Sequence, residues 1–275
     1  MAEAAPLALE IDAVSVRFGG VHALERTSLE VRSGEVVGLI GSNGAGKTTL
    51  MDCVSGFVRP QEGRILVMGQ DVVGLAPEVR PYLGVGRSFQ DARLFPGLTV
   101  GEAVLVAFER HRPVRVLAAL AGLGRGAERE KREWADELIA QMGLEPYRDK
   151  LVSELSTGTR RIVDIASILA QRPAVLLLDE PTAGIAQKEA EVFVPLLDQV
   201  RAQLGCSILI VEHDMPLIMA VSDRIYAMET GTVIAEGPPD VVRRDPRVIS
   251  SYLGTDEAAI LRSGAQPGVG RHRTG

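Results

Sequence analysis

The sequence predicts an α/β fold in which a parallel sheet core carries an antiparallel β subdomain and an inserted α-helical lobe. Continuously apolar runs at 36–40 and 174–178 are typical of parallel strands, because such strands are covered on both faces. Alternating apolar and polar residues at 7–18 indicate half-exposed antiparallel strands. A polar stretch at 128–142 has an apolar residue at every fourth position, which indicates a helix that packs on one face.

The N-terminal part of the chain predicts the β subdomain. Apolar residues alternate with polar ones from Leu7 to Phe18, and the pattern returns from Ser28 to Val31. Two short strand-like pieces, ILVMG and DVVGL, follow within 65–75. Because such strands leave one polar face, we expect them to pair antiparallel beside the parallel core.

The middle block, 81–160, predicts the helical lobe. Trp134, Leu138 and Met142 recur on one face of its long polar segment. The stretch 112–126 predicts a loop with a short amphipathic helix, and a membrane-surface anchor is the alternative interpretation.

The C-terminal part predicts a return to alternating helices and strands. A helix from Arg161 precedes the strand 174–178, and a second helix at about 187–204 precedes the strand SILIV. This alternation indicates a parallel sheet with crossover helices. Pro195 should kink the second helix or break it just before that residue.

These segments predict one domain spanning 7–253. Residues 7–80 and 161–253 form the core with its β subdomain, and 81–160 forms the lobe. Residues 254–275 are rich in Gly and Arg, so we expect a disordered tail.

Composition excludes some classes of function. The formal net charge of −6 over 275 residues argues against a surface that binds nucleic acid. The two cysteines, Cys53 and Cys206, lie far apart in apolar segments, which predicts buried reduced thiols and a cytosolic protein. The N-terminus lacks the features of a signal peptide, and the apolar run 116–124 is shorter than the ~18 residues that cross a bilayer. We therefore expect that any membrane-spanning part belongs to other chains.

A glycine-rich loop directly follows the first buried strand. GSNGAGKTT matches the G-x-x-x-x-G-K-[ST] pattern, in which glycines let backbone N–H groups face phosphate oxygens. Lys47 would place its charge at the β- and γ-phosphates, Thr48 would offer a hydroxyl to Mg²⁺, and the next helix would point its N-terminus at the anion. The predicted nucleotide-binding residues of this loop are Gly41, Ser42, Asn43, Gly44, Ala45, Gly46, Lys47, Thr48 and Thr49.

Two further strands end in groups suited to phosphoryl transfer. LLLDEP places Asp179 and Glu180 at the carboxyl end of a buried strand, where ligands bind in open α/β sheets. Asp179 would hold Mg²⁺ through its water shell, and Glu180 would orient or deprotonate a water in line with the γ-phosphate. VEHD places His213 at the same edge, where it would sense the γ-phosphate and hold Glu180 in place.

The order of these motifs resembles that of the ABC-transporter ATPases. SFQ with Gln90, then LSTGT, LLLDEP, AGIA and EHD follow the phosphate loop, and the likeness reaches Gly254. The segments RFGGVHAL, RSFQDARLFPGLTVGEAVLVA, EHDMPLIMAVSDRIYAME and PRVISSYLG are similar to those of subunits that energise branched-chain amino-acid importers. Some of these short marks are shared with a lipopolysaccharide-transport relative.

The resemblance implies a P-loop NTPase core of the ABC ATPase fold, with ATP and Mg²⁺ as ligands. It implies that Phe18 stacks on adenine and that Gln90 is a catalytic and magnesium-site residue that links this site to the helical lobe. Family members act as pairs, so Ser156, Thr157 and Gly158 would contact the ATP of a second ATPase subunit. The segment from Gln90 to Leu94 would lie near a groove for a cytoplasmic helix of a transmembrane permease.

The chain departs from the family pattern at its expected dimer seam. Thr157 replaces a small residue, Thr159 replaces the usual amide, and Ala186 replaces an aspartate. These changes bear on dimer contacts and on coupling between sites more than on nucleotide binding. Arg160 and Arg161, which follow the loop, are expected on a solvated helix face or in contacts within the lobe.

The resemblance predicts an ATPase of a membrane importer, bound peripherally at the cytoplasmic face of the cell membrane. Its partners would be a second ATPase in a homodimer or heterodimer, two permease subunits and, indirectly, a solute-binding protein. Three alternatives stay open: a regulatory ATPase without transport, the ATPase of an exporter or lipid-extraction complex, and a catalytically weak member of an unequal pair.

Overall fold

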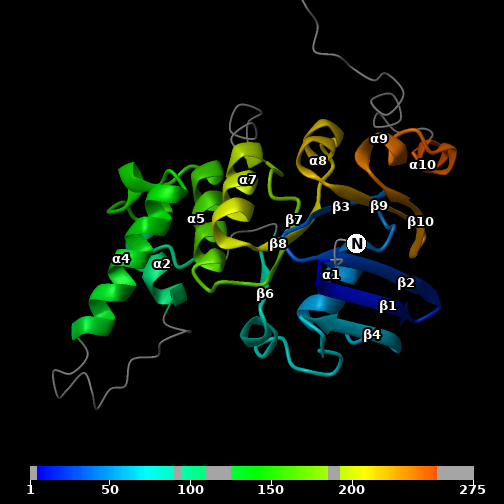
Figure 1. Cartoon of the computed structure of the whole chain (residues 1–275), viewed down its shortest axis with the longest axis horizontal. Coiled ribbons are helices and arrows are strands. Elements are labelled where there is room, and N and C mark those ends of the chain that lie inside the picture. The colour runs from blue at the N-terminus through cyan, green and yellow to red at the C-terminus, as the bar shows by residue number, and fades with distance from the viewer. Residues whose placement is uncertain (1–4, 90–93, 109–124, 185–192, 253–275) are drawn as a thin grey trace, which may run out of the picture.

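Strands from distant parts of the chain form a six-stranded sheet in the computed structural model, which describes residues 5–89, 94–108, 125–184 and 193–252. The strand order is β10-β9-β3-β8-β7-β6 (Figure 1). Neighbouring strands from β9 to β6 pair in parallel, and β10 pairs antiparallel with β9. The strands are β3 (Val36–Ile40), β6 (Val85–Arg87), β7 (Val175–Asp179), β8 (Ser207–Val211), β9 (Arg224–Glu229) and β10 (Thr232–Gly237). The predicted parallel core is confirmed.

Both faces of this sheet are covered, which explains the continuously apolar strands. In β3, Val36 and Ile40 pack into one hydrophobic cluster, whereas Val37 and Leu39 pack into another. The first cluster contains residues of the helices on the lobe side, and the second contains residues of the antiparallel strands and of α1 (Lys47–Ser55). A strand that alternates between two apolar layers cannot carry polar residues on either side.

A four-stranded antiparallel sheet lies beside this core, in the order β2-β1-β4-β5 (Figure 1). Its strands are β1 (Leu7–Phe18), β2 (Val21–Arg32), β4 (Glu62–Val67) and β5 (Gln70–Asp71). The β subdomain is therefore confirmed, but DVVGL forms almost no strand. Asp71 Oδ1 accepts a hydrogen bond from Val73 N at 2.8 Å, and this local turn competes with continued pairing.

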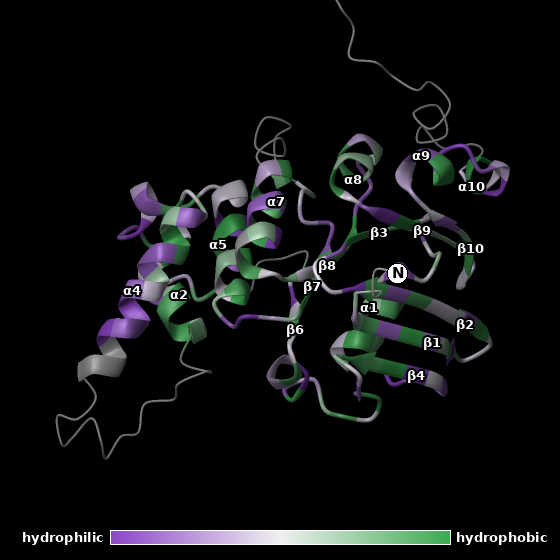
Figure 2. Cartoon of the chain, viewed as in Figure 1, coloured by the Kyte–Doolittle hydropathy of each residue, from purple (hydrophilic) through white to green (hydrophobic). Residues whose placement is uncertain are grey.

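The lobe side is built from helices whose apolar faces meet (Figure 2). α2 (Val100–Phe108) packs against α4 (Arg125–Gln141) and α5 (Thr157–Leu169), and α4 turns its polar face outward. Leu138 and Met142 are buried and Trp134 is half-buried, as the periodicity predicted. Three 3₁₀ helices occupy Arg80–Leu83, Glu145–Tyr147 and Val152–Glu154.

The range 81–160 is not helical throughout. Its residues Val85–Arg87 form β6, the edge strand of the six-stranded sheet, where Gly86 pairs with Leu176. Three residues are too short for a period-two pattern, and only the partner strand reveals them as strand. Helix α5 likewise begins four residues before the expected Arg161, because Ser156 caps it.

The helices that follow β7 in the chain pack on the six-stranded sheet. They are α7 (Phe193–Leu204), α8 (Met215–Val221), α9 (Pro239–Val242) and α10 (Pro246–Ser251). Pro195 is the third described residue of α7, and the residues just before Phe193 lie outside the described ranges, so the expected kink or break at Pro195 stays a prediction. The expected start of this helix near Gln187, the loop within 109–124 and the tail from 254 lie outside the described residues.

The fold bears on the predicted thiols and on the expectation that other chains span the membrane. Cys53 and Cys206 are both free and buried, and burial raises the pKa of each thiol to about 12. Within the described ranges, no helix combines the length and the apolar character needed to cross a bilayer.

Candidate functional site

The candidate site is a set of three loops at one edge of the six-stranded sheet. The loops follow β3, β8 and β7, which are neighbours and run parallel. Their carboxyl ends therefore point the same way, and they bring together the phosphate loop 41–46, the pair Glu212–His213 and the pair Asp179–Glu180. This confirms that the three motifs share one edge of the sheet.

Glycines of the phosphate loop adopt backbone conformations that other residues avoid. Gly44 has φ +83° and Gly46 has φ +101°. A Cβ on Gly46 would lie 2.5 Å from the carbonyl oxygen of Ala23, whereas a Cβ on Gly44 would meet no atom within 4 Å. Gly46 is thus required by packing, and Gly44 faces open space that a phosphate could approach.

Lys47 opens α1 and folds back over the loop. Its side chain is buried, with 6% of the residue exposed, and Nζ donates hydrogen bonds to the carbonyl oxygens of Gly41 at 2.5 Å and Ser42 at 3.1 Å. No side chain caps the N-terminus of α1. Its first backbone N–H groups and its positive dipole end therefore suit an anion. Thr48, next along the helix, is exposed.

Asp179 ends β7 as a buried carboxylate with one free oxygen. The residue is 5% exposed, and its Oδ2 lies 3.4 Å from Arg87 Nη2. Within the part of the chain that the structure describes, its buried Oδ1 has no hydrogen-bond partner. Burial raises the pKa of this carboxyl group, while Arg87 opposes the rise. An orphaned anionic oxygen beside a phosphate loop fits a hydrated magnesium ion.

Glu180 and His213 form a hydrogen-bonded pair. Glu180 Oε1 lies 2.7 Å from His213 Nε2, so the imidazole orients the carboxylate. Glu180 has φ +49°, an unfavourable value for a residue with a side chain. Its backbone N–H donates to the carbonyl oxygen of Val211 at 2.9 Å, which holds this turn against β8. The two side chains that the sequence predicted to cooperate are in direct contact.

Glu212 is a site residue that the sequence analysis missed. It is 4% exposed, and its Oε1 accepts hydrogen bonds from Thr182 N at 2.8 Å and Thr182 Oγ1 at 2.6 Å. Its Oε2 accepts from His213 N at 3.2 Å. Burial raises the pKa of its carboxyl group, and these hydrogen bonds oppose the rise. The sequence signal for Glu212 was weak. It is an acidic residue directly after a buried strand, in the motif VEHD, from which the sequence analysis interpreted the histidine alone.

The LSTGT loop forms the N-terminus of α5. Ser156 is exposed, and its Oγ accepts a hydrogen bond from Thr159 N at 3.1 Å and lies 3.0 Å from Thr159 Oγ1. Thr157 is exposed and Gly158 is buried. Thr159 therefore supplies a hydroxyl to the capping serine, where the family pattern would have an amide.

The two arginines after this loop face inward. Arg161 is 4% exposed and its Nη1 donates to the carbonyl oxygen of Phe89. Half-buried Arg160 donates from Nη2 to the carbonyl oxygen of Leu155 at 3.0 Å. Of the two environments expected for Arg161, a solvated face or contacts within the lobe, the structure shows the second, because its guanidinium donates to a carbonyl oxygen in the range 81–160.

Phe18 is a further predicted site residue that the structure describes. Phe18 lies at the end of β1 and is 54% exposed, so its ring is free of the core. Gln90 and Ala186 lie outside the described residues.

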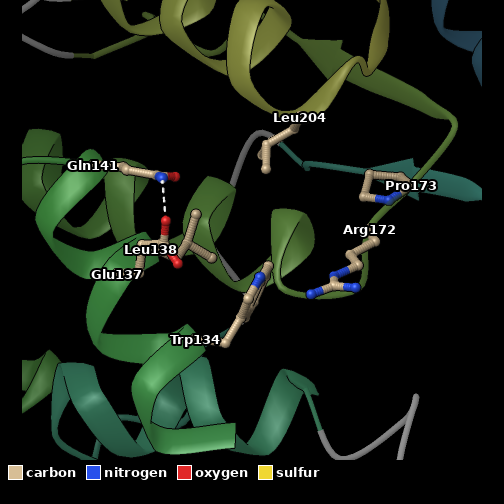
Figure 3. Close-up of a pocket in the computed structure, with 7 residues that line it drawn as sticks. All are labelled: Trp134, Glu137, Leu138, Gln141, Arg172, Pro173 and Leu204. Carbon is tan, nitrogen blue, oxygen red and sulfur yellow. Dashed lines mark hydrogen bonds between the residues drawn. The ribbon is translucent and has the colours of Figure 1, made fainter. Parts of the chain in front are cut away.

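One cavity lies away from the three loops. It has a volume of about 350 Å³ and lies between α4, the turn after α5 and the end of α7 (Figure 3). Arg172 stands over the Trp134 ring at 5.0 Å, and that ring stacks on Phe108 with a centroid separation of 4.7 Å. None of its lining residues belongs to the phosphate loop or to the loops after β7 and β8.

A second cavity, of about 140 Å³, opens beside β6. Its lining includes Phe57, Phe89, Arg80, Arg87 and Ile168. Phe57 and Phe89 meet edge to face at 5.7 Å, and Phe57 is 53% exposed. We call this cavity with its two rings the β6 groove.

Family models match two parts of the sequence. The model described as ABC transporter covers residues 24–183. The model described as branched-chain amino acid ATP-binding cassette transporter covers residues 232–258.

Curated relatives match nearly the whole chain. The high-affinity branched-chain amino acid transport ATP-binding proteins BraF of Pseudomonas aeruginosa and LivG of Escherichia coli are each 38% identical over 90% of this chain and 97% of their own length. The lipopolysaccharide export system ATP-binding protein LptB of Haemophilus influenzae is 37% identical over 82% of this chain and 89% of its own.

Solved structures share the fold. The ADP conformation of an ATP-binding cassette of an ABC transporter superposes with a TM-score of 0.78, at 29% identity, and covers 90% of this chain and 99% of that one. A dimeric cassette in a post-hydrolysis state with ADP and Pi superposes with a TM-score of 0.70, at 25% identity, over 84% of this chain and 98% of that one.

Proposed function

This chain belongs to the ABC transporter family, and from that premise we propose that it is the ATPase subunit of an importer for branched-chain amino acids. It binds ATP and hydrolyses it, as members of this family do. The observation that carries the substrate proposal is the match of 232–258 to the branched-chain amino acid model, together with 38% identity to BraF and LivG. The first likeness is confined to one segment, whereas the second spans 90% of the chain.

Export is the second candidate function, and one observation favours it. LptB, a lipopolysaccharide export protein, is 37% identical over 82% of the chain. The match at 232–258 supports import, because the matching model is described as a branched-chain amino acid ATP-binding cassette transporter and BraF and LivG are branched-chain amino acid transport proteins. The non-transport alternative has no comparable support.

The catalytic proposal assigns one role to each side chain of the site. Glu180 accepts a proton from, or orients, the water that attacks the γ-phosphate. His213 holds Glu180 at 2.7 Å and senses the γ-phosphate. Lys47 and the loop N–H groups bind the β- and γ-phosphates, and Phe18 stacks on the adenine. Lys47 then exchanges its bonds to loop carbonyl oxygens for bonds to phosphate.

A magnesium ion fits the same edge. Thr48 and Asp179 would hold it, with Gln90 as a third group, and the orphaned Asp179 Oδ1 supports this assignment. When bound, the ion neutralises charge on the β- and γ-phosphates. Asp179 stays ready for it because Arg87 counteracts the effect of burial on its charge.

A second ATPase subunit completes the site. Ser156, Thr157 and Gly158 lie at the start of α5, whose N–H groups and dipole face an anion of the partner's nucleotide. The dimeric cassette with ADP and Pi, at 25% identity, supports a pair of such subunits.

The membrane partners would be permease subunits, which hold this chain at the cytoplasmic face of the membrane, and a solute-binding protein would act through them. We place the permease's cytoplasmic helix in the β6 groove. The groove offers an exposed aromatic ring at Phe57 and is lined by Phe89, which precedes in sequence the segment from Gln90 to Leu94 for which the family resemblance implies this contact.

Transport in vesicles tests the proposal. The chain, coexpressed with the permease and binding-protein genes that neighbour its own, is purified as a complex and reconstituted with the ATPase outside. ATP should drive accumulation of labelled leucine, and unlabelled valine and isoleucine should compete while lysine should not. Release of lipopolysaccharide without leucine uptake would establish export in its place.

Glu180→Gln is the matched catalytic control. It keeps the size of the side chain but cannot accept a proton, so hydrolysis should fall by about 100-fold or more. Mg-ATP binding should persist and the dimer should stay closed. A Glu180→Gln complex that hydrolyses ATP at the parent rate would refute the assignment of the base.

A further inference from the structure

Arg87 joins the β6 groove to the magnesium side of the site. It is the last residue of β6, and only 6% of its side chain is exposed. Its Nη1 donates to Asp52 Oδ1 at 2.6 Å and to Ser55 Oγ at 3.1 Å, and its Nη2 lies 3.4 Å from Asp179 Oδ2. One guanidinium therefore contacts α1 and the end of β7 at once.

Two aromatic rings hold the other side of this guanidinium. Its Cζ lies 5.1 Å from the centroid of Phe89 and 5.9 Å from that of Phe57. Both rings line the groove together with Arg87 itself. An apolar side chain that enters the groove would touch the exposed ring of Phe57, and that ring touches Arg87.

The geometry of the Arg87 guanidinium makes its bond to Asp179 sensitive to a side chain that enters the β6 groove. A guanidinium is planar and rigid, so a tilt of its plane moves both terminal nitrogens together. The Asp52 contact at 2.6 Å is short, whereas the Asp179 contact at 3.4 Å is at the limit of a hydrogen bond. Among the described residues Arg87 Nε has no hydrogen-bond partner, so on that side the plane is held by ring contacts and not by a hydrogen bond. A small tilt would tighten or break the bond to Asp179.

We propose that Arg87 is a positioning residue that transmits occupation of the β6 groove to Asp179. Arg87 holds Oδ2 of that carboxylate and so directs Oδ1, which has no partner, toward the magnesium shell. Groove occupation moves the rings, the rings tilt the guanidinium, and Asp179 changes its hold on the ion. The inference rests on the proposed function, which places Mg²⁺ at Asp179 and a permease helix in the groove.

Arg87→Lys removes the guanidinium that contacts both Asp52 and Asp179 but keeps the positive charge at this position. A lysine cannot donate to Asp52 and Asp179 together while it stacks on two rings. Binding of Mn²⁺, as a paramagnetic probe for Mg²⁺, is measured by electron paramagnetic resonance with a non-hydrolysable ATP analogue present. The Kd for Mn²⁺ should rise about tenfold, because Asp179 loses the charged contact that directs Oδ1 toward the ion.

Phe57→Ala tests transmission from the groove without a change at the metal site. Phe57 is exposed, so the variant should fold, and the Kd for Mn²⁺ should change by about two- to threefold or more. Phe95→Ala is the matched control, because that residue is 67% exposed and is not among the described residues that line the groove. Arg80→Lys is the control for the buried arginine, since Arg80 lines the same groove and donates to the carbonyl oxygens of Leu75 and Val54.

The outcomes separate this inference from the proposed function. If the parent chain fails to bind the ATP analogue, the proposed function fails. If the parent binds it and folded Arg87→Lys and Phe57→Ala keep the parent affinity for Mn²⁺, the role of Arg87 is refuted. If Arg87→Lys does not fold, as its Tm will tell, the comparison of Phe57→Ala with Phe95→Ala decides alone. Equal changes in those two variants would also overturn the inference.

Discussion

Glu212 accepts two hydrogen bonds from Thr182 with one carboxylate oxygen. The backbone N–H of Thr182 donates at 2.8 Å and its hydroxyl donates at 2.6 Å. Thr182 follows Glu180 by two residues and Glu212 precedes His213. The contact therefore fastens the loop that carries the proposed base to the loop that carries its partner. A buried carboxylate with three hydrogen bonds is rigid, so it sets where Glu180 and His213 meet.

Glu212→Gln should slow hydrolysis more than it weakens nucleotide binding. The amide has one acceptor in place of two, so one N–H donor on Thr182 or His213 loses its partner at a cost of about 1–3 kcal/mol. We expect kcat to fall about tenfold and the Kd for Mg-ATP to change by less than about twofold. Thr182→Ser keeps the hydroxyl and is the control. Equal kcat values for Glu212→Gln and the parent would show that the contact does not position the base.

Gly44→Ala and Gly46→Ala should fail in different ways. An alanine at Gly44 meets no protein atom but must adopt φ +83°, so folding should lose about 1–2 kcal/mol. Its methyl group occupies the space open to phosphate, and the Kd for Mg-ATP should rise about tenfold. An alanine at Gly46 lies 2.5 Å from the Ala23 carbonyl oxygen and should cost about 1–3 kcal/mol more.

Urea unfolding and a fluorescent ATP analogue measure the two effects separately. A Gly44→Ala variant that binds nucleotide as the parent does would show that phosphate does not approach this side of the loop.

Ser156→Arg should abolish cooperative hydrolysis while nucleotide binding persists. The serine lies at the start of α5 and is proposed to act on the partner subunit's ATP, so its loss leaves the chain's own phosphate loop intact. Ser156→Asp is the companion variant. An aspartate still caps the helix, which avoids a loss of about 1 kcal/mol, but its charge repels the γ-phosphate. ATPase rates against protein concentration should lose their upward curvature in both variants, and retention of that curvature would make the loop a scaffold only.

Asp164→Asn should stabilise the protein at neutral pH and leave it unchanged in acid. Burial raises the pKa of Asp164 to about 6 from its ordinary value of 3.8, an effect that Arg161 opposes in part. Because the folded pKa is raised, the contribution of Asp164 to stability is most favourable below about pH 4 and is lost as the pH rises through about 6. The rise in pKa corresponds to at most about 3 kcal/mol.

Urea unfolding between pH 3 and pH 8 checks this prediction, within the range where the parent is folded. The free energies of unfolding of the parent and Asp164→Asn should run together near the acid end, separate above about pH 4 and keep a constant difference above about pH 6. Asp149→Asn, at a side chain that is 90% exposed, should show no such divergence. Parallel curves for Asp164→Asn and the parent would contradict the raised pKa.

Local pattern was enough for much of the fold. Continuous apolar runs predicted β3 and β7, and alternating apolar and polar residues predicted β1. Both patterns follow from strand geometry, because successive side chains point to opposite faces of a sheet. The phosphate loop was equally clear, since glycine and lysine at fixed spacing have few other uses next to a buried strand. The strand β6 was missed because three residues carry no period, and its pairing with β7 is non-local.

The sequence by itself determined which residues can carry charge to a phosphate and which strands lie inside. Only the tertiary structure decided how those groups are held. Glu212 reaches Thr182 across 30 residues, and Arg87 reaches Asp179 across 92. Such partners depend on the strand order β3-β8-β7-β6, which brings distant strand ends side by side. A buried polar group must find a partner, but which partner it finds is a property of packing, and no local spacing encodes it.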